Sequence, residues 1–280
     1  MARKKSILGL DIGTSWVKAV ELFDTGSQFQ LSAFSMAKVQ SQEDVRGAIR
    51  DVIRKGGFKT KRVVTAVSGR SVIVRYVSMM QMTDEDLKSA IRFEADKYIP
   101  FEVEEVVLDC QKLEENVEKP ESGDREMKVL LVAVKASLIE EHVAMLQDLG
   151  LQPVTIDVDS FALGNAFELT YLNSSGMADD DRVVALIDIG ASKTNITILK
   201  GATSYFTREV YLAGNEFTEA VSRRLGIDSQ EAENLKTNPG DKLAEVEEAV
   251  LPVLDDLGNE IHLSFDFFEN QFDREVDQVF

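Results

Sequence analysis

The stretch Leu8-Gly-Leu-Asp-Ile-Gly-Thr-Ser15 decides the fold, because the second half of the chain contains a close copy, Leu186-Ile-Asp-Ile-Gly-Ala-Ser-Lys193. In each copy an apolar strand ends in Asp-Ile-Gly, and a second apolar strand follows at once, over residues 17–22 and 195–199. Glycine lets the backbone turn tightly beside an anion, and the N–H groups of such a turn can bind phosphate. One copy alone would indicate an ordinary hairpin turn. Two copies favour a phosphate site and two domains of similar construction.

The carboxylate at the end of each first strand has a separate role. It does not bind phosphate directly, because both groups are negative, but it can bind a hydrated Mg2+ that bridges them. An unpaired carboxylate at the end of an apolar strand is costly, and a purely structural hairpin more often has Asn or Gly there. We therefore predict that Asp11 and Asp188 are catalytic and metal-binding residues.

The two turns supply the remaining phosphate contacts. The predicted phosphate-binding residues are Gly13, Thr14, Ser15, Gly190, Ala191, Ser192, Lys193 and Thr194. Lys18 is a further candidate that would neutralise phosphate charge, although alternation along its strand directs it equally well toward solvent.

The paired hairpins resemble those of the actin-like ATPase superfamily, which includes actin, Hsp70, sugar kinases, MreB and FtsA. The resemblance is strongest to the PilM family of type IV pilus assembly proteins and runs through nearly the whole chain. It implies an α/β, actin-like (ribonuclease H-like) fold of two domains that binds ATP and Mg2+. The stretches that carry it are residues 1–22, Ala90-Ile-Arg-Phe-Glu-Ala-Asp-Lys-Tyr-Ile-Pro-Phe101, residues 148–159 and Glu231-Ala-Glu-Asn-Leu-Lys236.

Periodicity and turn signals divide the chain into four segments. The resemblance implies that residues 1–78 are the first half of domain 1 (1A) and that residues 79–153 are an inserted α+β module of the 1C type. It also implies that residues 154–172 return to domain 1 and form a crossover helix, and that residues 173–280 form domain 2. Expected strands are 28–38, 62–68, 71–77, 106–113, 127–135, 154–157 and 203–209. Expected helices are 41–55, 83–98, 139–149, 160–171, 217–225, 230–236 and 244–272. A polar linker is expected over 173–182 and a charged loop over 114–126.

The resemblance also implies residues for the nucleoside. Glu233 and Lys236 lie one turn apart on an expected helix, so they share a face. Matching residues in MreB-like proteins contact ribose and adenine, whereas the alternative is an ordinary surface ion pair. Gly214 and Asn215 match the family's loop ahead of that region.

Two carboxylates lie near the expected crossover between the domains. The resemblance implies that Asp157 lies where the family has hinge and metal-proximal groups. Asp159 either shares that role or caps the following helix.

The implied partner is the cytoplasmic N-terminal peptide of a PilN-like inner-membrane protein, together with other pilus platform proteins. The family binds this peptide in a groove between the first domain and the inserted module. Candidate contacts are Phe93, Tyr98, Ile99, Pro100 and Phe101. No strong general base is evident, so we expect slow ATP hydrolysis at most, with ATP acting as a structural or switching ligand.

Composition limits the classes of function. The net charge of −18 argues against nucleic-acid binding and against attraction to anionic lipid. No apolar run approaches the roughly 20 residues of a membrane helix, and the single Cys110 fits a reducing cytoplasm. We expect a cytoplasmic protein that reaches the inner membrane only through its partners.

Two alternatives belong to other functional classes. A sugar-kinase-type phosphotransferase needs a substrate pocket, which the small module does not obviously supply. An FtsA-like cell-division protein would carry an amphipathic membrane helix after a linker. The family also continues beyond this point with a strand and a double glycine, so we expect a C-terminally truncated fold without the last strand and the wall that contacts the base.

Overall fold

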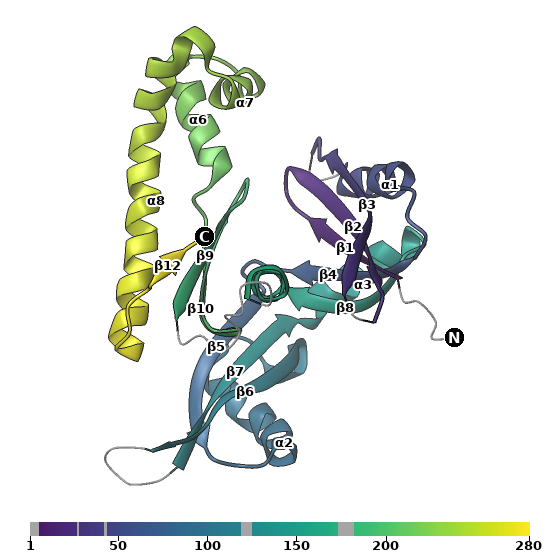
Figure 1. Cartoon of the computed structure of the whole chain (residues 1–280), viewed down its shortest axis with the longest axis vertical. Coiled ribbons are helices and arrows are strands. Elements are labelled where there is room, and N and C mark those ends of the chain that lie inside the picture. Colours follow the sequence, from purple (N-terminus) through teal and green to yellow (C-terminus); the bar gives the residue numbers. More distant parts are fainter. Residues whose placement is uncertain (1–5, 27, 42–43, 119–124, 173–181) are drawn as a thin grey trace. The chain divides into compact units, whose positions relative to one another are not determined.

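The computed structural model describes residues 6–26, 28–41, 44–118, 125–172 and 182–280. The chain forms two compact units (Figure 1). The first unit comprises residues 1–12 and 16–162, and the second comprises residues 13–15 and 163–280. The linker expected over 173–182 lies almost entirely outside the described residues. None of the described helices is both long enough and apolar enough to cross a bilayer.

The first unit contains a five-stranded sheet in the order β3-β2-β1-β4-β8. Its strands are β1 (Ser6–Ile12), β2 (Trp16–Asp24), β3 (Phe29–Lys38), β4 (Arg62–Val67) and β8 (Gln152–Val158). β1 pairs antiparallel with β2, which confirms the first predicted hairpin. β4 lies parallel to both β1 and β8, and such parallel neighbours require crossover connections.

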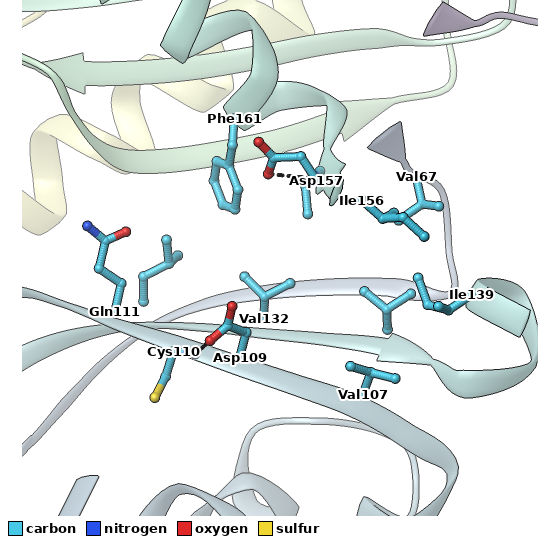
Figure 2. A pocket seen from close by; sticks show the side chains of 13 residues that line it. Val67, Val107, Asp109, Cys110, Gln111, Val132, Ile139, Ile156, Asp157 and Phe161 are labelled. Atoms are coloured by element: carbon cyan, nitrogen blue, oxygen red, sulfur yellow. Dashed lines mark hydrogen bonds between the residues drawn. The ribbon is translucent and has the colours of Figure 1, made fainter. Parts of the chain in front are cut away.

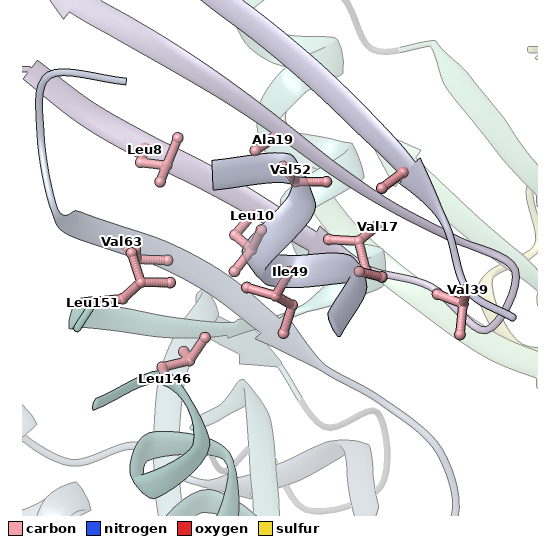
Figure 3. Close-up of a cluster of buried hydrophobic side chains, with 12 residues drawn as sticks. Leu8, Leu10, Val17, Ala19, Val39, Ile49, Val52, Val63, Leu146 and Leu151 are labelled. Atoms are coloured by element: carbon pink, nitrogen blue, oxygen red, sulfur yellow. The ribbon is translucent and has the colours of Figure 1, made fainter. Parts of the chain in front are cut away.

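The core of this sheet follows from period-2 alternation on the strands and helical spacing on α1 (Val45–Gly56) (Figure 3). Leu8 and Leu10 of β1 face Ile49 and Val52 of α1. α3 (Ala136–Asp148) adds the fully buried Leu146. α1 begins at Val45, later than the sequence indicates, and ends before Gly57, whose positive φ of 61° suits a residue without a side chain.

A three-stranded antiparallel sheet in the order β5-β7-β6 belongs to the inserted module. Its strands are β5 (Val72–Met80), β6 (Val106–Glu118) and β7 (Arg125–Lys135). One face packs on α2 (Asp84–Glu94) through Val129, Leu131 and Ala133. α2 begins after Thr83, whose hydroxyl accepts the Asp86 N–H at 3.2 Å and so caps the helix. Two 3-10 turns, η2 (Ala95–Lys97) and η3 (Val103–Glu105), lead into β6.

Two expectations for the module differ from the structure. The strand expected over 71–77 was placed with the first domain, but β5 pairs with β7 in the module's own sheet. The charged stretch after residue 113 was expected to be a loop, but β6 continues to Glu118. Ladder pairing with β7, including Glu114 opposite Lys128, keeps this polar stretch extended. Residues 119–124 lie outside the described range.

The second unit contains a four-stranded sheet in the order β11-β10-β9-β12. Its strands are β9 (Val183–Ile189), β10 (Thr194–Lys200), β11 (Thr203–Val210) and β12 (Gln278–Val279). β9 and β10 pair antiparallel, which confirms the second predicted hairpin. β12 pairs in parallel with β9, so the last strand expected to be missing begins within this chain.

Helices complete the second unit. They are the end of α4 (Asp159–Phe167) with its π-helical continuation η4 (Glu168–Leu172), α6 (Gly214–Leu225), α7 (Ser229–Thr237), and η5 (Gly240–Lys242) leading into α8 (Leu243–Phe272). The C-terminal half of α8 (Figure 1) carries Phe268, which packs into the core of the sheet. The N-terminal half packs Val246 and Ala249 against Val221 of α6 and Ala232 of α7.

Candidate functional site

The carboxylate of the first hairpin is exposed and paired. Asp11 lies within β1, directly opposite Lys18 on β2. The Lys18 ammonium lies 3.1 Å from a carboxylate oxygen of Asp11, and the Asp11 side chain is 60% exposed. The cost of an unpaired carboxylate at this strand end is therefore avoided by an ion pair within the hairpin. In this structure Lys18, the residue expected to neutralise phosphate, neutralises Asp11 instead.

The second turn is closed by its own backbone. The Gly190 N–H donates to the Lys193 carbonyl at 3.0 Å. A Cβ atom on Gly190 would lie 2.9 Å from that carbonyl oxygen, which explains why the turn needs glycine. Asp188 is exposed near the end of β9.

Two side chains predicted for this turn are engaged within the protein. The Lys193 ammonium lies 2.7 Å from Glu209, and the buried Thr194 hydroxyl donates to the Leu212 carbonyl at 2.7 Å. The Ser192 hydroxyl also has a partner, because it accepts a hydrogen bond from the Thr14 hydroxyl at 3.1 Å.

The second turn contacts the start of α6. The Gly214 N–H donates to the Gly190 carbonyl at 3.0 Å, and the Asn215 N–H donates to the Ala191 carbonyl at 2.7 Å. A Cβ on Gly214 would lie 3.1 Å from the Gly190 oxygen, so glycine permits this close approach. The structure thus brings together four of the residues that the sequence assigned to the nucleotide.

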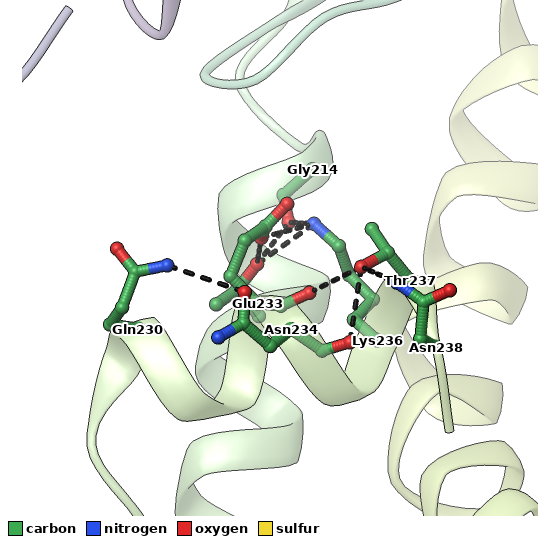
Figure 4. A network of polar contacts seen from close by, with 8 residues as sticks. Gly214, Gln230, Glu233, Asn234, Lys236, Thr237 and Asn238 are labelled. Atoms are coloured by element: carbon green, nitrogen blue, oxygen red, sulfur yellow. Dashed lines mark hydrogen bonds and ion pairs between the residues drawn. The ribbon is translucent and has the colours of Figure 1, made fainter. Parts of the chain in front are cut away.

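Glu233 and Lys236 of α7 join the same cluster (Figure 4). The Lys236 ammonium lies 2.6 Å from the Glu233 carboxylate, 3.0 Å from the Gly214 carbonyl and 2.8 Å from the Thr218 hydroxyl. That hydroxyl also lies within hydrogen-bond distance of Glu233 and of the Gly214 carbonyl. Sequence reasoning missed Thr218, although it lies four residues after Gly214 and therefore on the same face of α6.

Replacing Thr218 by Val is expected to loosen this cluster. Thr218 is 6% exposed, and the change leaves buried polar partners with one contact fewer. We expect the free energy of local opening of α6 and α7 to fall by about 1–2 kcal/mol, measured by amide hydrogen exchange. Thr218→Ser keeps the hydroxyl and is the matched control. Equal amide protection in the wild type, Thr218→Val and Thr218→Ser would show that the hydroxyl contributes nothing to the local stability of α6 and α7.

The two carboxylates near the crossover have different environments. Asp157 lies inside β8 and is half-buried; burial, with Asp159 nearby, raises the pKa of its carboxyl. Asp159 is the first residue of α4, and its carboxylate accepts the N–H of the adjacent Ser160 at 2.8 Å. Among the described residues, no group of three or more His, Cys, Asp or Glu side chains is arranged to bind a metal ion. The metal-binding roles of Asp11, Asp188 and Asp157 stay predictions.

A groove of about 280 Å³ lies within the first unit, between the module's sheet and the β4–β8 edge of the larger sheet (Figure 2). Asp157 lines it. β6 and β7 form one wall, while β4, β8 and the first turn of α4 form the other, and α3 contributes one residue. The lining residues are Val67, Val107, Asp109, Cys110, Gln111, Leu130, Val132, Val134, Ile139, Ile156, Asp157, Val158 and Phe161.

Alternation on β7 explains why this groove is apolar. Val129, Leu131 and Ala133 face α2, so Leu130, Val132 and Val134 face the groove. An antiparallel sheet with one solvated face would carry polar residues at the second set of positions. The uninterrupted apolar run over residues 129–134 was therefore the sequence signal for a second covered face.

The predicted partner-binding residues lie elsewhere on the module. Ile99 is 7% exposed and belongs to the core beneath α2, where Tyr98 and Phe101 also pack. The Lys135 ammonium lies 4.6 Å from the centre of the Phe101 ring. Phe93 is 81% exposed. None of these residues, nor Pro100, lines the groove.

Comparison with known proteins identifies a matching family and similar solved structures. Residues 9–280 match the family model described as type IV pilus assembly protein PilM. The solved PilM–PilN type IV pilus biogenesis complex is similar with a TM-score of 0.78 and 30% identity, over 95% of this chain and 78% of that chain. The ethanolamine utilization protein EutJ from Carboxydothermus hydrogenoformans is similar in fold alone, with a TM-score of 0.55 and 14% identity, over 98% of this chain and 75% of that one.

Curated relatives are more distant. The cell division protein FtsA of Streptococcus pneumoniae serotype 2 (strain D39 / NCTC 7466) is 23% identical over 271 residues, or 86% of this chain and 57% of FtsA. FtsA of Bacillus subtilis (strain 168) is 23% identical over 273 residues, or 86% of this chain and 59% of FtsA. The chain therefore spans less than two thirds of the length of these relatives.

The similarity to solved structures confirms the predicted actin-like fold. The family model covers nearly the whole chain, and the PilM–PilN complex shares both its fold and 30% of its residues. The chain therefore belongs to the PilM family of type IV pilus assembly proteins.

Proposed function

We propose that this chain is an adaptor of type IV pilus assembly that binds the cytoplasmic N-terminal peptide of a PilN-like inner-membrane protein in the groove of the first unit. One observation carries the proposal: β7, the central strand of the sheet β5-β7-β6, is apolar on both faces, and its second face lines a groove rather than a closed core. The similar solved structure is a complex of PilM with PilN.

The groove has the chemistry of a peptide site. It is lined mainly by aliphatic side chains and one aromatic ring, Phe161, with few polar groups. Sites of this kind obtain affinity from apolar burial and orientation from a small number of polar contacts. Its walls are sheet strands, which fix their side chains before any ligand arrives. The exposed Phe93 and its neighbours remain a second proposed contact surface.

We also propose that the chain binds ATP with Mg2+. Support comes from the second unit, where the turn after β9, the start of α6 and the Glu233–Lys236 pair converge. The N-terminus of the 12-residue α6 carries partial positive charge and suits a phosphate. Within the second unit, Asp188 and the turn over residues 13–15 are proposed to contact the phosphates and the metal ion. Asp11 remains a proposed metal-binding residue of the first unit.

The chain's residues supply positioning rather than a strong general base. Within the cluster at Gly214, Glu233 is paired with Lys236. Hydrolysis would therefore be slow, and ATP would act as a ligand that biases conformation. The protein would reach the inner membrane through its partner.

Calorimetric titration tests both parts. A synthetic peptide from the N-terminus of the PilN-like protein, titrated into the full chain, should bind one to one, whereas a scrambled peptide should not. A C-terminal FtsZ peptide tests the alternative FtsA-like function, and binding of that peptide alone would overturn the pilus assignment.

A titration of Mg·ATP into the wild type and into Asp188→Ala tests the nucleotide site, because the variant should bind the nucleotide more weakly.

A further inference from the structure

The charged residues that line the groove share one sign. Of its 13 lining residues, Asp109 and Asp157 are the charged ones, and the remainder are apolar apart from Gln111 and Cys110. Figure 2 shows Asp109 on the wall formed by β6 and Asp157 on the wall formed by β8. We propose that the groove selects a peptide segment with a Lys or Arg side chain flanked by apolar residues, the cation lying against these two carboxylates. This inference rests on the proposed docking function.

The register of the sheet sets the order of chemistry along the groove. Three alternate rungs of the β6–β7 ladder face it. They are Val107 opposite Val134, Asp109 opposite Val132, and Gln111 opposite Leu130. The sequence along this wall is therefore apolar, acidic, then mixed, with about 7 Å between rungs. An extended peptide has the same two-residue repeat, so apolar and cationic side chains at alternate positions match these rungs.

The electrostatics of the groove favour a cation. Asp109 contributes to a raised pKa of the Cys110 thiol, after the larger effect of burial. The charge of Asp109 therefore acts on a group that lines the groove. The net charge of −18 also draws cationic segments toward the protein.

The test uses N-acetylated peptides, so that the side chain is the sole source of the cation. The PilN-like N-terminal peptide and a version with each Lys or Arg replaced by Gln are titrated into the wild type and the double variant Asp109→Asn, Asp157→Asn. Asp51→Asn on α1 removes the same kind of charge outside the groove and is the matched control. Thermal unfolding followed by circular dichroism confirms that each variant is folded.

Changing the protein alone, or the peptide alone, should weaken binding about tenfold. Combining both changes should cost little more than either alone, because they remove the same interaction. A peptide with Glu in place of the basic residue should regain affinity for Asp109→Lys. If the affinity losses caused by the protein change and the peptide change are independent, the inference is overturned, although docking in the groove stands. A natural peptide without Lys or Arg would have the same consequence. Absence of any binding by the wild type overturns docking itself.

Discussion

Replacing Val132 by Arg should lower the affinity for the PilN-like peptide at least a hundredfold, which is about 2.7 kcal/mol. Val132 is half-buried and lies on the groove face of β7, directly opposite Asp109. The longer side chain fills the groove and presents its guanidinium to Asp109, where the peptide's cation would lie. The α2 face of the sheet is unchanged, so the module should remain folded. The measurement is the dissociation constant by calorimetry.

Two matched variants separate the groove from other effects of Val132→Arg. Gln30→Arg adds the same charge at an exposed position of β3 and should bind normally. Phe93→Ala tests the surface that the sequence indicated, and docking in the groove predicts little effect from it. If Val132→Arg binds normally and Phe93→Ala does not, the peptide docks beside α2 and the groove assignment is wrong.

Most of the fold could be predicted, because its elements follow local periodicity. Both hairpins and the long α8 appear where strand and helix patterns place them. The pairing of β5 could not be predicted, since a strand that follows β4 after a short turn can join either sheet. Local sequence signals also predicted that β6 ends at residue 113, earlier than it does. Pairing with β7 overrides the poor strand propensity of the charged residues that follow.

The candidate sites were only partly accessible from sequence. The candidate nucleotide cluster was accessible, because glycine turns and a helical Glu–Lys pair have recognisable spacing. The position of the groove between the first domain and the module was implied by the family resemblance, but its lining residues were not, because they depend on which faces of the two sheets meet. The aromatic stretch from Phe93 to Phe101 was predicted as a contact surface, yet folding uses Ile99 as core. Apolar composition alone does not distinguish a core residue from a docking residue.

Glu21 is a carboxylate in the core of the first unit, at a position that the alternation of inward and outward residues along β2 directs inward. On β2 it shares the inward face with Val17 and Ala19, and it is 2% exposed. Its carboxylate accepts hydrogen bonds from the Ser6 hydroxyl at 2.5 Å and the Ser32 hydroxyl at 3.0 Å. The backbone N–H groups of residues 59 and 60 donate to it at 3.1 and 3.0 Å. One side chain thus joins β1, β2, β3 and the loop before β4.

Glu21→Ala should lower the free energy of unfolding of the first unit by about 3 kcal/mol, because several buried donors lose a charged acceptor. Glu21→Gln keeps one acceptor oxygen and should cost about 1 kcal/mol. Urea unfolding followed by Trp16 fluorescence measures both, since Trp16 is the single tryptophan and lies on the same strand. Glu85→Gln, at an exposed position of α2, is the control.

The pH dependence of the Glu21 effect has a definite sign. Burial by itself would raise the pKa of this carboxyl, but hydrogen bonds from Ser6, the Lys59 N–H, Ser32 and the Thr60 N–H outweigh it and lower the pKa from its ordinary value of 4.5. A group with a lowered folded-state pKa stabilises the protein above its unfolded pKa, and this stabilisation is lost as pH falls through the folded value. The advantage of the wild type over Glu21→Gln should therefore be complete at about pH 7 and smaller at about pH 3.5. An advantage that grows on acidification would contradict the assignment, because it would mean that the protonated carboxyl is the form that folding prefers.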